Sequence, residues 1–333
     1  MRTVSLAVRA AGRRLVTEPD TVFVGLSGGA DSLALAVAAI DWFSRQGVAV
    51  NAVTVDHAMR EGSAEESERI AAVAKDLGAT TACVVRVETG ATGGPETRAR
   101  EARREALRDI AAGAPILLGH TVDDQAETVL MRLGRGSGAG SLRAMDDIVV
   151  DERGTLWVRP LLEGVRRADT LAFCDALGLE VVADPTNAVD GPWRRADGGP
   201  LVRQAVRERV MPALADALGQ DPVPALARTA RMLGDDDDAL EIVAQDAYER
   251  AFTGGTSMSL SVDVRILGRE PAAIRRRVIH QVLSRAGRPG DLRARDVEAV
   301  DRLLTDWHGQ GPLSLPGVTA ARTDGEILFT AVD

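Results

Sequence analysis

Cysteine is scarce in this chain, and long hydrophobic runs are absent. The two cysteines, Cys83 and Cys174, lie far apart, so the sequence has neither a disulfide framework nor the paired spacing of a metal knuckle. No apolar run approaches the roughly 18 residues of a membrane span, and arginines rather than an apolar signal core occupy the N-terminal stretch. We therefore expect a cytoplasmic protein without a membrane partner.

Lysine is nearly absent as well, since Lys75 is the only one, and the formal net charge is −9. A negative net charge argues against a general polyanion-binding protein, although clustered basic residues can still bind RNA locally. The arginines gather in groups, at 98–104, 194–195, 203–209 and 275–277. Each group is either a solvated helix face or part of an RNA-binding surface.

The 333 residues predict two domains, because domains of about 100–200 residues are typical. In the first half, apolar β-branched segments alternate with helical ones; the expected strands are 22–26, 48–57, 81–87 and 114–119, with helices at 65–77 and 96–112. Such alternation predicts an α/β fold with a Rossmann-like parallel sheet and right-handed crossovers. We expect the chain to leave this sheet at Leu156 and to form one more short strand at 180–182.

The second half has a different character. We expect a long helical region at 222–252 broken at Gly234, helices at 271–285 and 294–307, a strand at 260–264 and a hairpin from 313–316 and 326–330. The predicted domains are an α/β domain over residues 1–214 and a smaller, mainly helical domain over residues 215–333.

A glycine-rich loop follows the first expected strand and opens a helix. Its residues are Ser27, Gly28, Gly29, Ala30, Asp31 and Ser32. Glycines in a strand-to-helix turn let backbone N–H groups approach an anion, and the helix N-terminus adds about half a positive charge. The serines add hydroxyl donors, and Asp31 could hold a magnesium ion. The alternative interpretation is a turn that only begins a helix.

Polar residues follow two other expected strands. Asp56 and His57 end the second, and His120 ends the fourth, just before a helix that carries Asp124 and Glu127. Parallel strands place their carboxyl ends at one edge of the sheet, where ligands bind, so these residues should converge with the loop. Asp124 and Glu127, three apart on one helix face, could grip an ammonium group. Alternatively, they form a capping box.

With these stretches combined, the chain resembles the ATP-pyrophosphatase superfamily and, within it, the tRNA(Ile)-lysidine synthetase family. The resemblance covers nearly the whole chain. It rests on Ser27–Ser32, 55–60, the Glu96-x-x-Ala99-Arg100-x-x-Arg103 pattern, 120–128 with Arg135-Gly136, 159–162, 184–187, 228–230 and 315–317. One departure concerns the family's Arg-Asn-x-x-Arg pattern, which is matched best by 203–207, displaced by an extra segment.

The resemblance implies a reaction. ATP adenylates C2 of the wobble cytidine of tRNA(Ile) with a CAU anticodon, and free L-lysine then displaces AMP. It implies that the loop and Asp56 bind ATP and that Asp31 binds Mg²⁺. Asp31, Arg100, His120, Asp124 and Glu127 would form the catalytic group, with Asp124 and Glu127 gripping lysine. A homodimer is left open.

Other functions remain as alternatives. A tRNA thiolase on the same domain would need a cysteine or an iron–sulfur cluster near the loop, and neither cysteine is well placed for that. A non-catalytic nucleotide- or RNA-binding protein would have no need of Asp31, Asp124 and Glu127 together. An amidating ligase for small molecules fits the arginine-rich helices less well.

Overall fold

A computed structural model gives the structure of residues 2–15, 19–58, 62–87, 95–182, 194–195, 197–256, 259–287 and 292–332. The chain divides into two compact units, Met1–Met232 and Leu233–Asp333. Within the described ranges, no helix is both long enough and apolar enough to cross a membrane.

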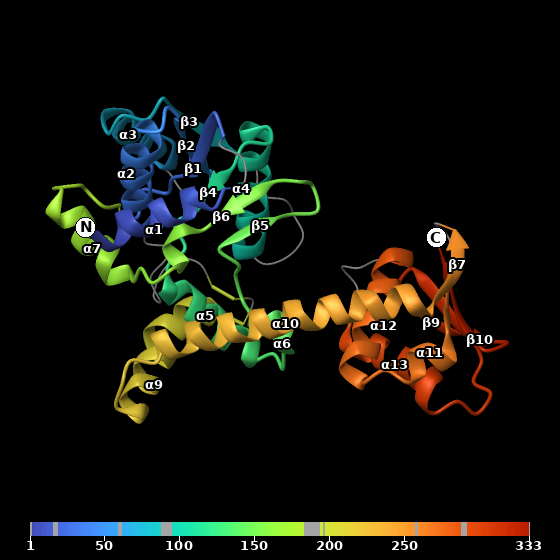
Figure 1. Ribbon diagram of the computed structural model, residues 1–333. Helices are drawn as coiled ribbons and strands as arrows, with labels where there is room; N and C mark the ends of the chain where they lie inside the picture. The colour runs from blue at the N-terminus through green and yellow to red at the C-terminus, as the bar shows by residue number, and fades with distance from the viewer. Residues whose placement is uncertain are drawn as a thin grey trace. The chain divides into compact units, whose positions relative to one another are not determined.

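The first unit is built on a six-stranded sheet with the order β3-β2-β1-β4-β6-β5 (Figure 1). Its strands are β1 (Thr21–Gly25), β2 (Ala49–Asp56), β3 (Thr81–Arg86), β4 (Ile116–Leu117), β5 (Ile148–Val150) and β6 (Leu156–Val158). All neighbours pair in parallel except β5, which runs antiparallel to β6. The prediction of a parallel α/β sheet is confirmed. The expectation that the chain leaves the sheet at Leu156 is wrong, because β6 pairs with β4 through Trp157 and Val158.

Helices cover both faces of this sheet. They are α1 (Arg2–Arg13), α2 (Ala30–Ser44), α3 (Ser63–Asp76), α4 (Pro95–Ala111) and α7 (Arg167–Ala176). One core joins α1, α2, α3 and α7 to alternate strand residues such as Val22 and Val24. A second core joins Leu107 and Ala111 of α4 to the opposite face, at Val53 and Ile116. The sheet is therefore buried on both faces, as its nearly continuous apolar strands require.

The remaining elements of this unit follow the fourth strand. They are α5 (Val122–Leu133), α6 (Ala139–Leu142), the short helix η1 (Pro160–Leu162), α8 (Val202–Ala205), the π-helical turn η3 (Val206–Val210) and α9 (Met211–Leu218). The expected strand at 180–182 does not form, and this segment instead donates one hydrogen bond, from Val182 N to Gly28 O at 3.0 Å. It therefore borders the glycine-rich loop without joining the sheet.

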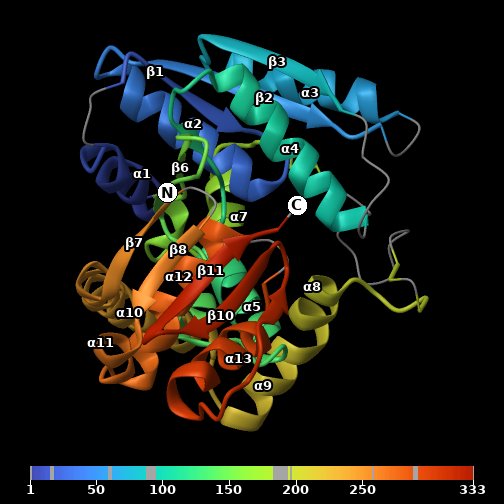
Figure 2. The same ribbon diagram turned by 90° about the vertical axis from the view of Figure 1, so that its right-hand side faces the viewer.

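The second unit combines helices with a five-stranded antiparallel sheet, which Figure 2 shows with its strands side by side. The sheet order is β7 (Phe252–Thr256), β8 (Ser259–Asp263), β11 (Glu326–Ala331), β10 (Val318–Thr323) and β9 (Leu313–Leu315). The helices α11 (Val264–Gly268), α12 (Ala272–Ala286) and α13 (Ala294–Thr305) contribute most of the apolar core against one sheet face. The sheet is larger than the single strand and hairpin that we expected. The predicted hairpin of 313–316 with 326–330 is wrong, because β10 lies between β9 and β11 and pairs with both.

One long helix, α10 (Val223–Ala251), runs through the boundary between the two units. It is continuous, so the predicted break at Gly234 is wrong; an isolated glycine costs a helix only about 1 kcal/mol. The acidic run after Gly234 is partly used inside the second unit, where Asp237 forms an ion pair with Arg277 of α12. These carboxylates need no metal ion to explain them.

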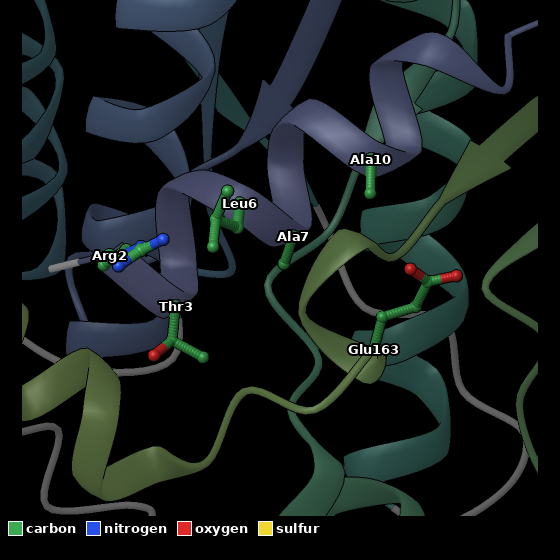
Figure 3. Close-up of a pocket in the computed structure, with 6 residues that line it drawn as sticks. All are labelled: Arg2, Thr3, Leu6, Ala7, Ala10 and Glu163. Carbon is green, nitrogen blue, oxygen red and sulfur yellow. The ribbon is translucent and has the colours of Figure 1, made fainter.

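A shallow hollow of about 350 Å³ lies along α1. Figure 3 shows its lining residues, with Arg2, Thr3, Leu6, Ala7 and Ala10 on the helix and Glu163 across from them. Glu163 also forms an ion pair with Arg14, at 2.5 Å. None of the predicted site residues lines this hollow, so the candidate site must be sought at the carboxyl edge of the sheet.

Candidate active site

The glycine-rich loop owes its shape to Gly28. This residue has φ +79°, and a Cβ atom there would lie 2.6 Å from Ile70 Cδ1 and 3.0 Å from Val182 Cγ2. Gly29 differs from the expectation, because its φ is −70° and a Cβ atom would meet only the Ser27 hydroxyl, at 3.7 Å. The loop therefore requires glycine sterically at Gly28, while Gly29 leaves open space beside the backbone.

The N-terminus of α2 is open to an anion. Among the described residues, no side chain caps it. The first N–H groups of a helix have no acceptor within the helix, so those of Ala30, Asp31 and Ser32 need an external one. The Ser32 hydroxyl closes the loop, accepting from Ser27 N at 3.1 Å and donating to Gly29 O at 3.0 Å. The Ser27 side chain is exposed beside it.

The ends of three parallel strands meet at this edge, as predicted. Strand β1 runs into the loop between β2, which ends at Asp56, and β4, which is followed by Gly119 and His120. A Cβ atom on Gly119 would lie 2.9 Å from the carbonyl oxygen of Asp31, so the chain after β4 passes directly against the loop. Asp56 is buried, and its Oδ1 accepts from Ala58 N at 2.9 Å.

Asp31 is held by the first turn of α7. Thr170 Oγ1 donates a hydrogen bond to Asp31 Oδ1, and Arg167 Nε lies 3.8 Å from Asp31 Oδ2. Burial raises the pKa of the Asp31 carboxyl to about 6, while the Thr170 hydrogen bond and the charge of Arg167 act in the opposite direction. Nothing in the sequence of α7 indicated that this helix would reach the loop.

Asp124 and Glu127, the acid pair of α5, are both buried. Asp124 Oδ2 accepts from Thr121 N at 2.9 Å and from Thr121 Oγ1 at 3.0 Å, which makes Thr121 the N-cap of a helix beginning at Val122. A capping box therefore exists, but with Thr121 and Asp124 as its partners. This capping box accounts for the contacts of Asp124 Oδ2, but for those of neither Asp124 Oδ1 nor Glu127.

Three arginines converge on this acid pair. Arg167 donates to Asp124 Oδ1 at 3.0 Å and to Glu127 Oε1 at 3.2 Å. Arg207 of η3 donates to Glu127 Oε1 at 2.7 Å and to Glu127 Oε2 at 3.0 Å. Arg203 of α8 donates to Thr128 Oγ1 at 2.8 Å, with its Nε 3.9 Å from Glu127 Oε2. Arg167 thus contacts both the acid pair and the loop aspartate, and joins the two segments that the sequence singled out.

The three arginines were not predicted as part of this site. Arg203 and Arg207 were noted only as a displaced family pattern, and Arg167 was not singled out. The spacing of Arg203 and Arg207, four residues apart on a helix, indicates a shared face. It does not indicate which surface that face meets.

Another polar residue of α5 has a structural role. Gln125 Nε2 donates to the carbonyl oxygens of Arg143 at 3.1 Å and Met145 at 2.9 Å, and Gln125 Oε1 accepts from Met145 N at 3.0 Å. These bonds fix the segment that leads from α6 to β5. Gln125 therefore orders the backbone beside the site.

His120 lies among cations. Burial lowers the pKa of its imidazole to about 3, and Arg159, Arg103 and Arg100 lower it further, against the opposing charge of Asp124. Its Nδ1 atom is covered and has no hydrogen-bond partner among the described residues. The imidazole is therefore neutral at pH 7 and can act there as a hydrogen-bonding group rather than as a cation.

Arg100 is exposed on α4, and Arg103 lies one turn further along. Burial lowers the pKa of Arg103 to about 10, and the charges of Arg100 and Arg203 contribute. The positive charges of these arginines therefore act on one another at this side of the site. Such an arrangement favours an anionic ligand. The motif residues 59–60 and 184–187 lie outside the described residues.

Comparison with known proteins identifies the family. A PP-loop domain family matches residues 6–214, and the TilS substrate binding domain family matches residues 263–328. The tRNA(Ile)-lysidine synthase of Leifsonia xyli subsp. xyli is 44% identical over 311 residues, covering 92% of this chain and 89% of that protein. The chain belongs to the tRNA(Ile)-lysidine synthase family. A second member, from Thermobifida fusca, is 42% identical over 333 residues, covering 98% of this chain and 97% of that protein.

A solved structure shares the fold of this PP-loop ATP-binding domain. The U34-tRNA thiolase NcsA from Methanococcus maripaludis, determined with its [4Fe-4S] cluster, aligns with a TM-score of 0.57 at 19% identity. The alignment covers 70% of this chain and 79% of that chain. At 19% identity, this similarity shows a shared fold and nothing further.

Proposed function

We propose that this synthase-family member joins free L-lysine to C2 of the wobble cytidine, position 34, of tRNA(Ile) with a CAU anticodon. In the first step, the C2 oxygen of the cytidine attacks the α-phosphorus of ATP and pyrophosphate leaves. In the second, a neutral amine of lysine attacks C2, and AMP leaves with the electron pair of the broken C–O bond. The observation that carries the proposal is the contact of Arg167 with both Asp31 of the phosphate loop and the acid pair.

The loop binds the phosphates of ATP. In-line attack on phosphorus depends mainly on positioning and on neutralising charge. The N–H groups of Ala30, Asp31 and Ser32, with the open side of Gly29, supply donors aimed at one anion, while the Ser27 hydroxyl is hydrogen-bonded to Ser32 Oγ at 3.1 Å and shapes the loop. Each such donor can contribute roughly 3–4 kcal/mol at the barrier. Asp56, at the adjacent strand end, borders the nucleotide.

A magnesium ion fits beside this loop. In the described part of the chain, no cluster of three or more His, Cys, Asp or Glu side chains could form a complete metal cage. Magnesium usually takes one or two carboxylates together with substrate phosphates, so Asp31 beside the phosphate loop meets that requirement. When bound, the ion supplies neutralisation of phosphate charge. Thr170 and Arg167 keep the Asp31 carboxylate at the loop.

Lysine binds at the acid pair. Asp124 and Glu127 are buried carboxylates, which need a cation because an unpaired buried charge is costly. Arg100 lies on the cationic side of the site, where it stabilises the phosphate charge that develops during adenylation. Neutral His120 lies between these regions and positions the substrates by hydrogen bonding. The target base must leave its stack to react, which an anticodon loop permits.

Sulfur transfer is not favoured over this reaction. An iron–sulfur cluster is held by several thiolates, and the chain has two cysteines in all. Contrary to the expectation from sequence, Cys174 lies against the loop, with its Sγ 3.5 Å from Ala30 O. It is buried, however, and burial raises the pKa of its thiol, as it does that of Cys83 in β3.

A three-component assay tests the proposal. The full-length protein is incubated with ATP, labelled lysine and tRNA(Ile) bearing the CAU anticodon, and pyrophosphate release and label in RNA are followed together. We expect label in the RNA only when all three are present, and none with a methionine tRNA of the same anticodon. Pyrophosphate release without any lysine in the RNA would contradict the ligation.

A further inference from the structure

The acid pair is already saturated with protein cations. Glu127 Oε1 accepts from Arg167 and Arg207, and Glu127 Oε2 accepts from Arg207. Asp124 Oδ1 accepts from Arg167 at 3.0 Å and from Arg207 at 3.4 Å, and Asp124 Oδ2 is taken by Thr121. An incoming ammonium group must therefore replace one of these guanidinium groups.

Arg207 is the arginine that can be replaced. Arg167 is fixed by its own backbone, whose N–H donates to Asp123 Oδ2 at 2.8 Å, and by the packing of Phe173 and Cys174 of the same helix in the main core. Arg203 holds Thr128 and approaches Glu127 only at 3.9 Å. Arg207 reaches the acids from a π-helical turn, and among the described residues its ion pairs are with Asp124 and Glu127, whereas Arg167 also lies against Asp31.

A displaced Arg207 would need a new anion. Burial lowers its pKa, but the hydrogen bond and charge of Glu127 raise it above the usual arginine value, so the guanidinium remains charged. Arg203 already approaches Glu127, and the other carboxylate acting on Arg207, that of Asp31, is held by Thr170 and Arg167. Binding that frees Arg207 without supplying a new anion is disfavoured, because the guanidinium charge is then left uncompensated.

We propose that Arg207 makes the site select a zwitterionic amino acid over a diamine by exchanging ion pairs with it. The substrate ammonium group takes the place of the guanidinium on Asp124 and Glu127, and the released guanidinium binds the substrate α-carboxylate. After this exchange the acid pair still has a cation, and Arg207 still has an anion. A diamine of the same length satisfies the acids but leaves Arg207 without an anion. This inference rests on the lysine-ligating function proposed above.

The experiment compares amines that differ only at the carboxylate. Lysine, lysinamide and 1,5-diaminopentane are supplied with ATP and tRNA to the full-length protein, and kcat/KM is measured for each. We expect the wild type to prefer lysine over either analogue by about 30-fold or more, the ratio that corresponds to roughly 2 kcal/mol. Equal use of lysine and the diamine by the wild type would overturn the proposal without any variant.

Variants then assign the selectivity to one side chain. Arg207→Gln should raise KM for lysine with little change for the diamine, so that the preference falls to within about threefold. Arg207→Lys keeps the charge and should restore part of the preference. Arg209→Gln, on the exposed side of the same turn, is the matched control and should keep the wild-type ratio.

The outcomes separate the two proposals. If Arg207→Gln lowers kcat/KM for lysine and the diamine equally, the residue acts structurally and the selectivity assignment fails while ligation stands. If the wild type attaches none of the amines to RNA, the proposed function itself fails.

Discussion

Gly119, at the end of β4, lies against the backbone of Asp31. A Cβ atom at Gly119 would be 2.9 Å from Asp31 O and 3.1 Å from Ser32 N, closer than real Cβ contacts allow. This approach places His120 and the start of α5 beside the phosphate loop. The sequence around Gly119 is that of an ordinary strand end and does not predict this close approach.

Gly119→Ala tests this contact. We expect the new methyl group to push the β4 end away from the loop, lowering the free energy of unfolding by about 1–3 kcal/mol and raising KM for ATP. Urea denaturation and initial rates at varied ATP measure both. Gly268→Ala, where the added atom meets open space, serves as control and should change neither quantity. Wild-type kinetics in Gly119→Ala would show that the approach does not set the loop.

Glu127 should respond differently to two substitutions. Glu127→Ala removes the carboxylate that both Arg167 and Arg207 contact. We therefore expect the free energy of unfolding to fall by about 3–5 kcal/mol. Turnover should be lost as well. Glu127→Gln keeps the shape and hydrogen-bond acceptor but not the charge. It should fold and lose lysine-dependent turnover by about 10²-fold, with pyrophosphate release less affected. Equal rates in wild type and Glu127→Gln would remove Glu127 from the lysine site.

The lowered pKa of His120 predicts that the stability of the folded protein depends on pH. Its folded pKa of about 3 is below the ordinary histidine value, so between pH 7 and pH 3 the unfolded chain binds a proton that the folded chain does not. Stability is therefore lost as pH falls, by about 2 kcal/mol at pH 5 for this group. His120→Gln should show a correspondingly smaller loss between pH 7.5 and pH 5.

Nitrogen NMR of the four histidines gives an independent measurement. We expect one imidazole that stays neutral at pH 5.5 and whose signal disappears in His120→Gln. Four histidines that all titrate near pH 6.5 would contradict the assigned environment.

Gln125 should matter for stability and not for substrate binding. Gln125→Leu removes the hydrogen bonds to the backbone of Arg143 and Met145 and leaves those groups unsatisfied, which should cost about 1–3 kcal/mol. KM values for ATP and lysine should remain close to wild type, measured at a temperature where the variant is folded. Gln46→Leu, at an exposed position, is the control. A selective rise in KM for lysine would place Gln125 in the site instead.

The sequence on its own determined the elements that depend on local pattern. Buried strands followed by helices predicted the parallel sheet. Because parallel strands end at one edge of the sheet, the sequence also predicted that Asp31, Asp56 and His120 lie at the same edge. Strand β6 was missed because three residues carry too little periodicity to distinguish a sheet strand from a connection. Strands β7 and β10 of the C-terminal sheet were also missed, and their pairing with β8, β9 and β11 became visible only in the tertiary structure.

Tertiary structure alone decided what surrounds the acid pair. Asp124 and Glu127 were visible as two carboxylates on one helix face, but their partners come from α7, α8 and η3, some 40 to 83 residues away. Each arginine reaches its carboxylate because whole helices pack together, and the spacing of residues along the chain does not predict that contact. The sequence therefore indicated which side chains carry the chemistry, whereas the fold decided that three arginines neutralise them and that Arg167 links them to the phosphate loop.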